Sequence, residues 1–360
     1  RDFFEDLVAT IRQVEQATGV TLTILQDLSG PKIRTCDLGL GTLDIAKGAD
    51  VYLGAPGMEA EAAVGEDDPV ICLDLPDVLR TLQVGDTVAL SDGMLQFKVI
   101  GREGDLLLKM RAENSGIAPP RKGIAFPGKT TPLDALTAKD KKDLAVGLEL
   151  GVDVVAMSYV QKPQDLQQLK TEMRKYDKVL PIIAKLERQS AIQNLQRIIE
   201  ESDGIMVARG DLGLECELAA LPSMQKRIIR ACNDAGKPVI VATQMLLSMV
   251  NSPIPTRAET TDVANAILDG ADCIMLSEET AIGKYPGGTV RFMRRIARMA
   301  EDFYFEGAGA SPVAPDDQEH PAKFLAYAAC LLAEKTHAKA LGSHSTSGNT
   351  ARILSACRPR

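Results

Sequence analysis

Short apolar runs rich in β-branched residues alternate with segments of helical periodicity through the second half of this chain. Such runs lie at residues 152–158, 181–186, 204–208, 238–243 and 271–277, and another lies upstream at 20–26. Strands that alternate with helices along a chain usually pair in parallel. The runs are apolar throughout, as expected for strands that helices cover on both faces. The pattern therefore predicts a parallel sheet built from β-α units.

Two helices of this region have recognisable first turns. Thr137 is followed three residues later by Asp140, and Thr256 by Glu259. A hydroxyl residue with an acidic residue three positions on is typical of a helix N-terminus, because each side chain can bind the backbone N–H of the other residue. We therefore expect helices to begin at these threonines, and we interpret the charged run at 139–143 as a solvated helix face.

The predicted sheet is interrupted by a segment of different character. Residues 37–126 show short alternating runs separated by turn signals, which indicates a small all-β domain inserted between 1–36 and 127–306. The flanking α/β strands suit either an open doubly wound sheet or part of a β/α barrel. A complete β/α barrel typically needs about 250 residues. The two α/β segments fall short of this by the size of one or two β-α units.

A further part is predicted at the C-terminal end. Glycine, alanine and proline dominate residues 307–315, which therefore have the composition of a linker. We expect 316–360 to be part of another α/β domain, with a helix at 323–335 and a strand that begins at 338–341.

Charge and cysteine content narrow the function classes. The 360 residues carry a net charge of −8, which disfavours a nucleic-acid binder because phosphate contacts need a basic surface. The seven cysteines form no Cys-x-x-Cys pair, so we predict reduced thiols and neither a disulfide framework nor a zinc site. No apolar run has the length of a membrane span, and no signal-peptide pattern opens the chain. We therefore expect a cytoplasmic protein with neither a membrane nor a nucleic-acid partner.

Polar residues follow the predicted strands at the end where parallel α/β proteins place their active sites. Glu187 and Asp211 follow neighbouring strands, so their carboxylates could share one divalent ion, and hard oxygen ligands favour Mg²⁺ or Mn²⁺. Lys185 lies two residues before Glu187, and strand alternation points both side chains to the same face. A fixed cation beside a metal suits an anionic oxyacid substrate. A simple ion pair between Lys185 and Glu187 explains the same two residues equally well.

Further cations collect at this end of the sheet. Lys32 and Arg34 follow the first strand, and a glycine-flanked turn at 209–213 offers backbone N–H groups to a carboxylate or phosphate. Local positive charge beside a metal indicates a phosphorylated or carboxylated ligand. The segment 123–130 matches the P-loop pattern letter for letter, but a proline-rich stretch precedes it and prolines interrupt it. We therefore do not expect a P-loop there.

These segments, taken in order, resemble those of the pyruvate kinase family. The matching segments are 27–35 (DLSGPKIRT), 121–128 (RKGIAFPG), 152–160 (VDVVAMSYV), 183–187 (IAKLE), 202–213 (SDGIMVARGDLG), 237–245 (KPVIVATQM), 255–259 (PTRAE) and 275–281 (MLSEETA). The resemblance implies a (β/α)8 barrel, here incomplete at its N-terminus, with an inserted β lid and a partial C-terminal α/β regulatory domain. It also implies an enzyme that makes pyruvate and ATP from phosphoenolpyruvate and ADP.

The resemblance assigns roles to residues at the strand ends. Glu187 and Asp211 would hold the Mg²⁺, with Mn²⁺ as an alternative, and Lys185 would stabilise the transferring phosphoryl group and the developing enolate. Arg34 would contact phosphate. Lys122 on the lid would reach the nucleotide phosphates when the lid closes and excludes water.

The substrate carboxylate and the enolate proton involve further residues. Backbone N–H groups of Gly210 and Asp211 would bind the carboxylate together with the hydroxyl of Thr243, which would also assist protonation of the enolate. Ser277 and Glu279 would belong to the polar network behind that proton.

One departure from the family pattern concerns monovalent cations. Family members that require K⁺ usually carry Glu at the position of Lys32 and Thr at that of Leu28. The Lys32 ammonium group can supply the charge of the missing ion, so we predict that K⁺ is not required. Asp27 matches a K⁺ ligand of the family, and Lys32 is its expected partner here.

The two ends of the chain also depart from the family. The family's first strand and its Asn-Phe-Ser-His-Gly segment would precede Arg1, so the resemblance implies either a fragment or a protein that lacks this catalytic segment. At the other end, Ser345, Ser347 and Thr350 resemble a loop that binds the phosphate of a sugar-phosphate or nucleotide effector, although a turn capped by hydroxyls explains them too. The family implies a homotetramer.

Two other functions remain open. Mg²⁺-dependent pyruvate lyases and aldolases also bind an enolpyruvate through a Glu/Asp pair in a barrel, although they need no nucleotide lid such as the one carrying Lys122. A non-catalytic fragment or pseudoenzyme would follow if the native polypeptide lacked the N-terminal segment.

Overall fold

The computed structural model describes residues 2–36, 42–58, 69–91, 93–129, 133–306 and 321–359. The chain divides into two compact units. The first unit comprises Arg1–Leu180, Leu186–Asn194 and Gly210–Leu221, and the second comprises Pro181–Lys185, Leu195–Arg209 and Pro222–Arg360. The predicted linker at 307–315 lies outside the described residues, and the predicted domain boundaries stay predictions.

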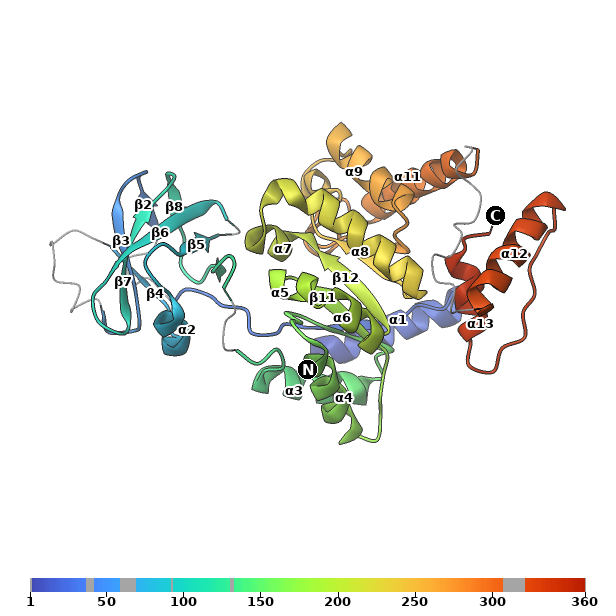
Figure 1. Cartoon of the computed structure of the whole chain (residues 1–360), viewed down its shortest axis with the longest axis horizontal. Coiled ribbons are helices and arrows are strands. Elements are labelled where there is room, and N and C mark those ends of the chain that lie inside the picture. The colour runs from blue at the N-terminus through green and yellow to red at the C-terminus, as the bar shows by residue number, and fades with distance from the viewer. Residues whose placement is uncertain are drawn as a thin grey trace. The chain divides into compact units, whose positions relative to one another are not determined.

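Helices and strands alternate along most of the described chain, apart from a run of strands near the beginning (Figure 1). In order, the elements are α1 (Asp2–Thr18), β1 (Leu25–Leu28), β2 (Leu43–Ile45), β3 (Asp50–Gly54), β4 (Val70–Cys72), α2 (Pro76–Thr81), β5 (Thr87–Leu90), β6 (Leu95–Arg102), β7 (Leu107–Ala112), β8 (Gly116–Ala118), β9 (Ile124–Ala125), α3 (Ala138–Leu150), β10 (Val154–Met157), α4 (Pro163–Arg174), β11 (Ile182–Leu186), α5 (Gln189–Gln193), α6 (Leu195–Glu201), β12 (Gly204–Ala208), α7 (Arg209–Glu215), the 3-10 helix η2 (Leu218–Ala220), α8 (Leu221–Ala235), β13 (Val239–Ala242), the 3-10 helix η3 (Leu247–Val250), α9 (Arg257–Leu268), β14 (Cys273–Ile274), α10 (Glu278–Ala281), α11 (Pro286–Glu306), α12 (Pro321–Lys335) and α13 (Asn349–Ala356).

The apolar runs form a sheet with strand order β1-β10-β11-β12-β13-β14. Strand β1 pairs with β10 in parallel, as do β12 with β13 and β13 with β14. Strand β12 spans Gly204–Ala208, the run predicted from the sequence, and all five of its residues are buried. The parallel pairing and the two-sided burial of this strand agree with the sequence pattern.

The first strand begins later than predicted. It spans Leu25–Leu28, whereas the apolar run extends over 20–26. Side chains bind the backbone that precedes it: Arg12 donates to the carbonyl of Leu22 at 3.0 Å, and Asp153 accepts the N–H of Ile24 at 2.7 Å. These bonds occupy the carbonyl of Leu22 and the N–H of Ile24, whereas the carbonyl of Ile24 accepts the N–H groups of Asp153 and Val154, and regular pairing with β10 begins at Leu25.

Both predicted helix starts are present as capping boxes. The Thr137 hydroxyl accepts the N–H of Asp140 at 3.1 Å, and Thr256 does the same for Glu259 at 3.2 Å. The charged run at 139–143 is nevertheless not a uniformly solvated face, because Asp140 is fully buried and also accepts the N–H of Gly30 at 3.1 Å. The residue that caps α3 therefore also binds the loop after β1.

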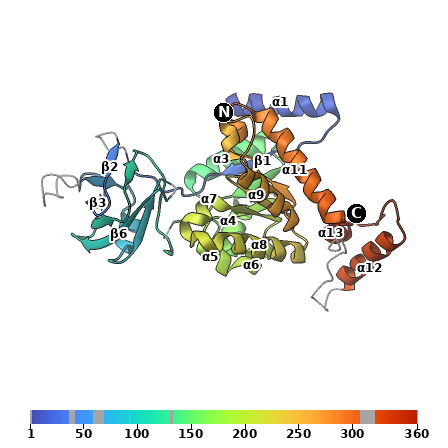
Figure 2. The same ribbon diagram turned by 90° about the horizontal axis from the view of Figure 1, so that it is seen from above.

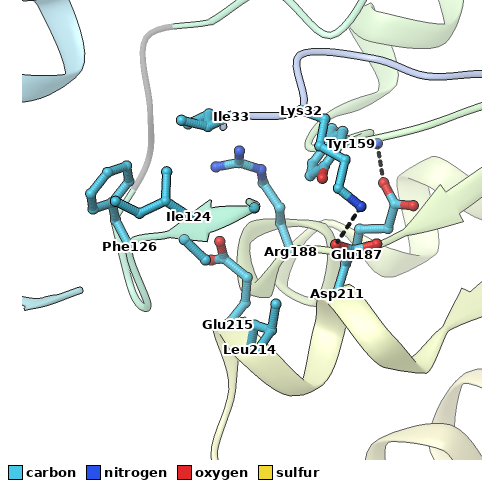
Figure 3. Close-up of a pocket in the computed structure, with 12 residues that line it drawn as sticks. Lys32, Ile33, Ile124, Phe126, Tyr159, Glu187, Arg188, Asp211, Leu214 and Glu215 are labelled. Carbon is cyan, nitrogen blue, oxygen red and sulfur yellow. Dashed lines mark hydrogen bonds and ion pairs between the residues drawn. The ribbon is translucent and has the colours of Figure 1, made fainter. Parts of the chain in front are cut away.

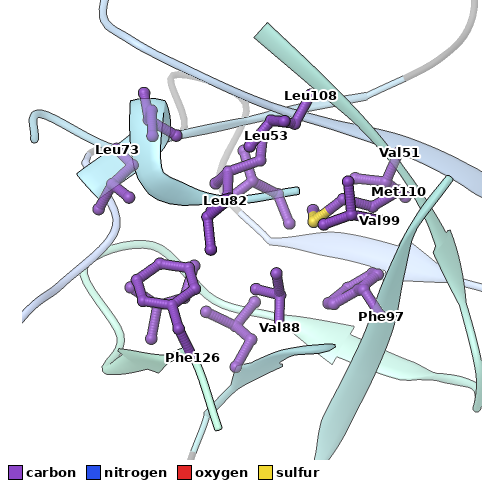
Figure 4. Packing of buried hydrophobic residues seen from close by; sticks show 14 of the residues in the cluster. Val51, Leu53, Leu73, Leu82, Val88, Phe97, Val99, Leu108, Met110 and Phe126 are labelled. Carbon is purple, nitrogen blue, oxygen red and sulfur yellow. The ribbon is translucent and has the colours of Figure 1, made fainter. Parts of the chain in front are cut away.

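The inserted segment folds into two sheets with mostly antiparallel pairing, and most of its buried apolar side chains form one large core. Strands β4-β3-β7-β6-β5-β9 form one sheet, and β2 and β8 form the other. Large side chains such as Phe97, Phe126 and Leu53 are buried within this core (Figure 4). Fully burying a side chain of this size stabilises a fold by about 1.5–3 kcal/mol.

The chain enters and leaves this β region as a two-stranded ribbon. Arg34 and Gly123 face each other in an antiparallel bridge, and Ile124 donates its N–H to the carbonyl of Ile33 at 3.1 Å. The N–H of Thr35 donates to the carbonyl of Lys122 at 2.9 Å, and the N–H of Lys122 donates to the Thr35 hydroxyl at 3.1 Å. Residues 33–36 and 121–124 are called the entry–exit ribbon below.

The P-loop-like segment folds as expected from its context. Strand β9 pairs with β5, and the described residues that follow it up to 129 form a turn and no helix. Lys129 pairs with Asp86 at 2.9 Å, while Thr130 lies outside the described residues.

In the second unit, helices α9 and α11 pack together, and α12 packs against α13 (Figure 2). The predicted helix at 323–335 lies within α12. The predicted strand at 338–341 was wrong: these residues are irregular and largely exposed, and they pair with no strand among the described elements. Within the described residues, no helix combines the length and the apolar content that a membrane crossing requires.

The prediction that all cysteines are reduced was wrong for one pair. Cys36 and Cys72 form a disulfide, with their Cα atoms 5.1 Å apart. The N–H of Cys36 donates to the carbonyl of Cys72 at 2.9 Å, so strand β4 lies against the entry–exit ribbon at this point. The sequence separation of 36 gives no signal for such a contact.

This disulfide can be tested by counting the free thiols. A thiol reagent in denaturant will detect five thiols in the unreduced protein and seven after reduction. Cys36→Ser will lower the free energy of unfolding by about 3–4 kcal/mol, because the crosslink restricts the unfolded chain. The matched variant Cys273→Ser, at an exposed free thiol, will leave stability nearly unchanged. Seven thiols before reduction would contradict the assignment.

Candidate active site

A narrow pocket lined by both charged and apolar residues lies in the first unit (Figure 3). It is lined by Lys32, Ile33, Gly123, Ile124, Ala125, Phe126, Tyr159, Glu187, Arg188, Asp211, Leu214 and Glu215. Its volume of about 30 Å³ accommodates an ion or one or two waters. Glu187 and Asp211, which strand-end reasoning predicts to lie together, both face this pocket.

The Glu187 side chain is held by Tyr159, which follows the neighbouring strand β10. Its side chain is only 2% exposed, and its Oε2 accepts the N–H of Tyr159 at 2.6 Å (Figure 3). Tyr159 has φ of +57°, a left-handed backbone conformation that residues other than glycine rarely adopt. A Cβ on Gly30, whose φ is +63°, would lie 2.8 Å from the Tyr159 ring. Glycine at position 30 therefore lets the loop after β1 approach this ring.

Asp211 lies at the start of a short helix rather than in a turn. The glycine-flanked segment predicted at 209–213 forms the beginning of α7 and places Gly210 and Asp211 in its first turn. Lys32 Nζ lies 3.9 Å from Asp211 Oδ1 (Figure 3), and Asp27 accepts a hydrogen bond from the Ser158 hydroxyl at 3.4 Å.

Arg188 and Glu215 belong to this pocket but were missed by sequence reasoning. The buried guanidinium of Arg188 lies 5.1 Å from the centre of the Tyr159 ring, a cation–π contact. Burial raises the pKa of Glu215 to about 7; Arg188 opposes this shift and Asp211 adds to it. Burial likewise raises the pKa of the Tyr159 phenol, which stays protonated. Arg188 directly follows Glu187 in the sequence, and this adjacency could have indicated that Arg188 belongs to the site.

Glu215 predicts a pH dependence of stability in the metal-free protein. Its pKa is about 7 in the folded state against 4.5 as the ordinary value. The folded protein therefore keeps a proton that the unfolded chain loses, so this contribution to stability falls as pH rises from about 4.5 through 7. Glu215→Gln removes this effect. The free energy of unfolding of the variant, relative to that of the wild type, will therefore rise between pH 5 and pH 8, by at most about 3 kcal/mol.

Urea unfolding in EDTA at several pH values checks this prediction. Glu200→Gln, at an exposed glutamate of α6, serves as the matched control and should follow the wild-type pH profile. Parallel profiles for the wild type and Glu215→Gln would contradict the assigned pKa.

The second unit carries the other strand-end residues. Lys185 is half-buried on β11, and Thr243 follows β13 with φ of +71°. Glu279 is 1% exposed and accepts the N–H groups of Ser277 at 2.7 Å and Leu246 at 3.1 Å. Glu279 therefore links α10 to the loop that contains Thr243.

Most of the remaining predicted residues are exposed. Arg34 and Lys122 come together in the entry–exit ribbon, where Arg34 donates to the carbonyl of Arg121 at 3.2 Å. Ser347 accepts the N–H of Asn349 at 3.4 Å, and Thr350 lies in the first turn of α13. Ser345 is half-buried.

The donor chemistry of the pocket fits a hard divalent ion. Glu187 and Asp211 supply carboxylate oxygens, and the bond from Tyr159 fixes the orientation of one of them. In the described part of the chain, no three His, Cys, Asp or Glu side chains gather closely enough to hold a metal by themselves. Mg²⁺ suits such a partial set, because it usually keeps several waters and takes further oxygens from its substrate.

A parallel α/β sheet with Glu187 and Asp211 after two of its strands is typical of enzymes of the β/α-barrel class. Comparison with known proteins supports this class. The family model "Pyruvate kinase, barrel domain" matches residues 2–290. The chain is 40% identical to a pyruvate kinase of Agrobacterium vitis over 357 residues, covering 98% of this chain and 72% of that protein. It is 38% identical to a human pyruvate kinase over 377 residues, covering 64% of that protein.

A solved structure extends the likeness to the fold. The crystal structure of a pyruvate kinase from Cryptosporidium parvum superposes with a TM-score of 0.84 at 34% identity, covering 98% of this chain and 72% of that one. The chain belongs to the pyruvate kinase family. This confirms the predicted barrel class and places the chain among phosphotransferases.

Proposed function

We propose that this chain transfers the phosphoryl group of phosphoenolpyruvate to ADP, giving pyruvate and ATP, as a step of glycolysis. The observation that carries the proposal is the pocket shared by Glu187 and Asp211 in a chain whose residues 2–290 match the pyruvate kinase barrel. The cations Lys32 and Arg188 in the same pocket support an anionic substrate.

In this proposal Glu187 and Asp211 hold Mg²⁺, or Mn²⁺ in its place, which when bound polarises substrate oxygens. Lys185 stabilises negative charge on the phosphoryl group and the enolate. Gly210, Asp211 and Thr243 bind the substrate carboxylate.

The other assigned residues act on the nucleotide and the proton. Arg34 and Lys122 contact the phosphates of the nucleotide. The Thr243 hydroxyl assists protonation of the enolate, and Ser277 and Glu279 support the loop and proton network behind it.

Release of pyruvate tests the proposal. The purified chain is mixed with phosphoenolpyruvate, ADP and Mg²⁺, and pyruvate and ATP are both quantified, with EDTA followed by excess Mg²⁺ as the control. We expect equal amounts of both products, loss of turnover in EDTA and recovery with Mg²⁺. Pyruvate without ATP, or binding of Mg²⁺ and phosphoenolpyruvate with no turnover, would overturn it in favour of a lyase or a pseudoenzyme.

Lys32 predicts that turnover does not need K⁺. Its ammonium group, 3.9 Å from Asp211, supplies a fixed positive charge near the proposed metal site. Turnover should be the same in K⁺, Na⁺ and tetramethylammonium buffers of equal ionic strength. Lys32→Glu is expected to make turnover depend on K⁺. Strong K⁺ activation of the wild type would contradict the prediction.

The finer predictions on regulation and assembly are proposals of the same kind. We propose a homotetramer, and an effector phosphate bound by Ser345, Ser347 and Thr350. We also propose a cytoplasmic location. The five free cysteines still support this location, although the disulfide between Cys36 and Cys72 weakens that support.

A further inference from the structure

The turn after β13 has a backbone conformation that ordinary side chains avoid. Thr243 has φ of +71° and Gln244 has φ of +54°, so two consecutive residues lie in the left-handed region. For a β-branched residue such as threonine this is an outlier, and such residues persist only where surrounding structure fixes them. The groups that hold this turn therefore determine where the Thr243 hydroxyl lies.

One arginine binds successive carbonyls of this turn. Arg209 begins α7 directly after β12, and its side chain is only 11% exposed. Its guanidinium donates to the carbonyl oxygens of Ala242 at 3.3 Å, Thr243 at 2.7 Å and Gln244 at 3.4 Å. The Thr243 hydroxyl donates to the same Ala242 carbonyl at 2.6 Å. Arg209 and the hydroxyl thus share an acceptor.

The guanidinium is itself fixed from the opposite side. Arg209 Nη1 lies 2.9 and 2.7 Å from the two carboxylate oxygens of Asp262 on α9. Its other nitrogens remain directed at the turn, an arrangement that the planar guanidinium permits and a lysine ammonium cannot reproduce. Beyond the turn, buried Glu279 accepts the N–H of Leu246.

We propose that Arg209 is a positioning residue for Thr243: by binding the carbonyls of residues 242–244, it fixes the direction of the hydroxyl that serves enolate protonation. This inference rests on the proposed function. In the step concerned, the methylene carbon of the enolate gains a proton and forms the methyl C–H bond of pyruvate. In the reverse direction that C–H bond breaks, and the proton passes to solvent through the same hydroxyl.

Exchange of the pyruvate methyl protons with D₂O, followed by NMR in the presence of Mg²⁺, isolates this step. Arg209→Met should slow exchange about 10²-fold, because a displacement near 1 Å costs about that much. Arg209→Lys should recover only part of the rate. The double variant Arg209→Met with Thr243→Ala should be no slower than Thr243→Ala alone, because both changes act through one hydroxyl. The affinity of the proposed site for Mn²⁺ should stay unchanged.

A matched control separates positioning from general stability. Arg12 binds both carboxylate oxygens of Asp153 at 2.9 and 2.8 Å, and also the carbonyls of Leu22 and Gly151. Arg12→Met removes the same kind of contact set at the opposite end of the strands. It should lower stability and leave exchange per folded molecule unchanged.

Three results would overturn the inference. The first is an exchange rate in Arg209→Met equal to that of the wild type. The second is a loss of rate in the double variant equal to the product of the two single losses. The third is a loss of rate per folded molecule in Arg12→Met as large as that in Arg209→Met. If Arg209→Met does not fold, Arg209→Lys and Asp262→Asn provide the same comparison. A wild-type protein with neither exchange nor turnover would overturn the proposed function itself, which is a different outcome.

Discussion

Lys185→Met is expected to lower the turnover number about 10²- to 10³-fold, the loss typical when one preorganised charge-stabilising group is removed from an active site. Lys185 is half-buried on β11, and methionine keeps much of its apolar length while removing the positive charge. Steady-state kinetics with phosphoenolpyruvate and ADP at saturating Mg²⁺ measure the effect. The loss should fall on the turnover number more than on the KM values, because the charge acts chiefly in the transition state.

Lys237→Met provides the matched control for this variant. Lys237 donates to the carbonyl of Ser202 at 2.6 Å and precedes β13, so it lies at the amino end of a strand, whereas the proposed site lies at the carboxyl end. It should retain turnover. Equal losses in the two variants would show that Lys185 contributes to folding and not to charge stabilisation.

Glu187→Gln is expected to weaken Mn²⁺ binding at least about 10- to 100-fold, the loss measured even when only a group behind a metal ligand is removed. Glutamine has nearly the same shape, and its carbonyl oxygen can still accept the N–H of Tyr159. What the substitution removes is the negative charge. Titration of the apo protein followed by electron paramagnetic resonance measures the affinity without relying on turnover.

Thermal unfolding gives an independent check on Glu187→Gln. Mg²⁺ should stabilise the wild type by mass action and leave this variant nearly unaffected. Glu172→Gln, at a buried glutamate that pairs with Lys175 at 2.8 Å, is the matched control and should bind Mn²⁺ like the wild type. Unchanged Mn²⁺ affinity in Glu187→Gln would remove this residue from the metal site.

Local patterns predicted those parts of the fold that local forces determine. The apolar run at 204–208 became β12 with the same bounds, and the caps at Thr137 and Thr256 formed as expected. Each of these signals lies within a few residues of the element that it specifies. Two-residue β14 shows the limit, because its apolar run at 271–277 is longer than the segment that pairs.

Long-range contacts explain most of what sequence reasoning missed. Arg209 meets Asp262 across 53 positions and Tyr159 meets Glu187 across 28, and no spacing rule connects such residues. Asp140 looked solvated because it lies in a charged run, yet the loop at Gly30 covers it. The run at 238–243 also gave no sign that Thr243 leaves the strand with a positive φ, because backbone dihedrals of this kind depend on the groups that hold them.

The entry–exit ribbon has a mechanical consequence for the two cations that it carries. Two independent linkers could move separately, whereas two strands joined by hydrogen bonds move together. Arg34 and Lys122 belong to opposite strands of this ribbon, and Thr35 and Lys122 are joined by two hydrogen bonds. The backbones that carry the two positive charges are therefore coupled, so that a displacement of one strand of the ribbon carries the other with it.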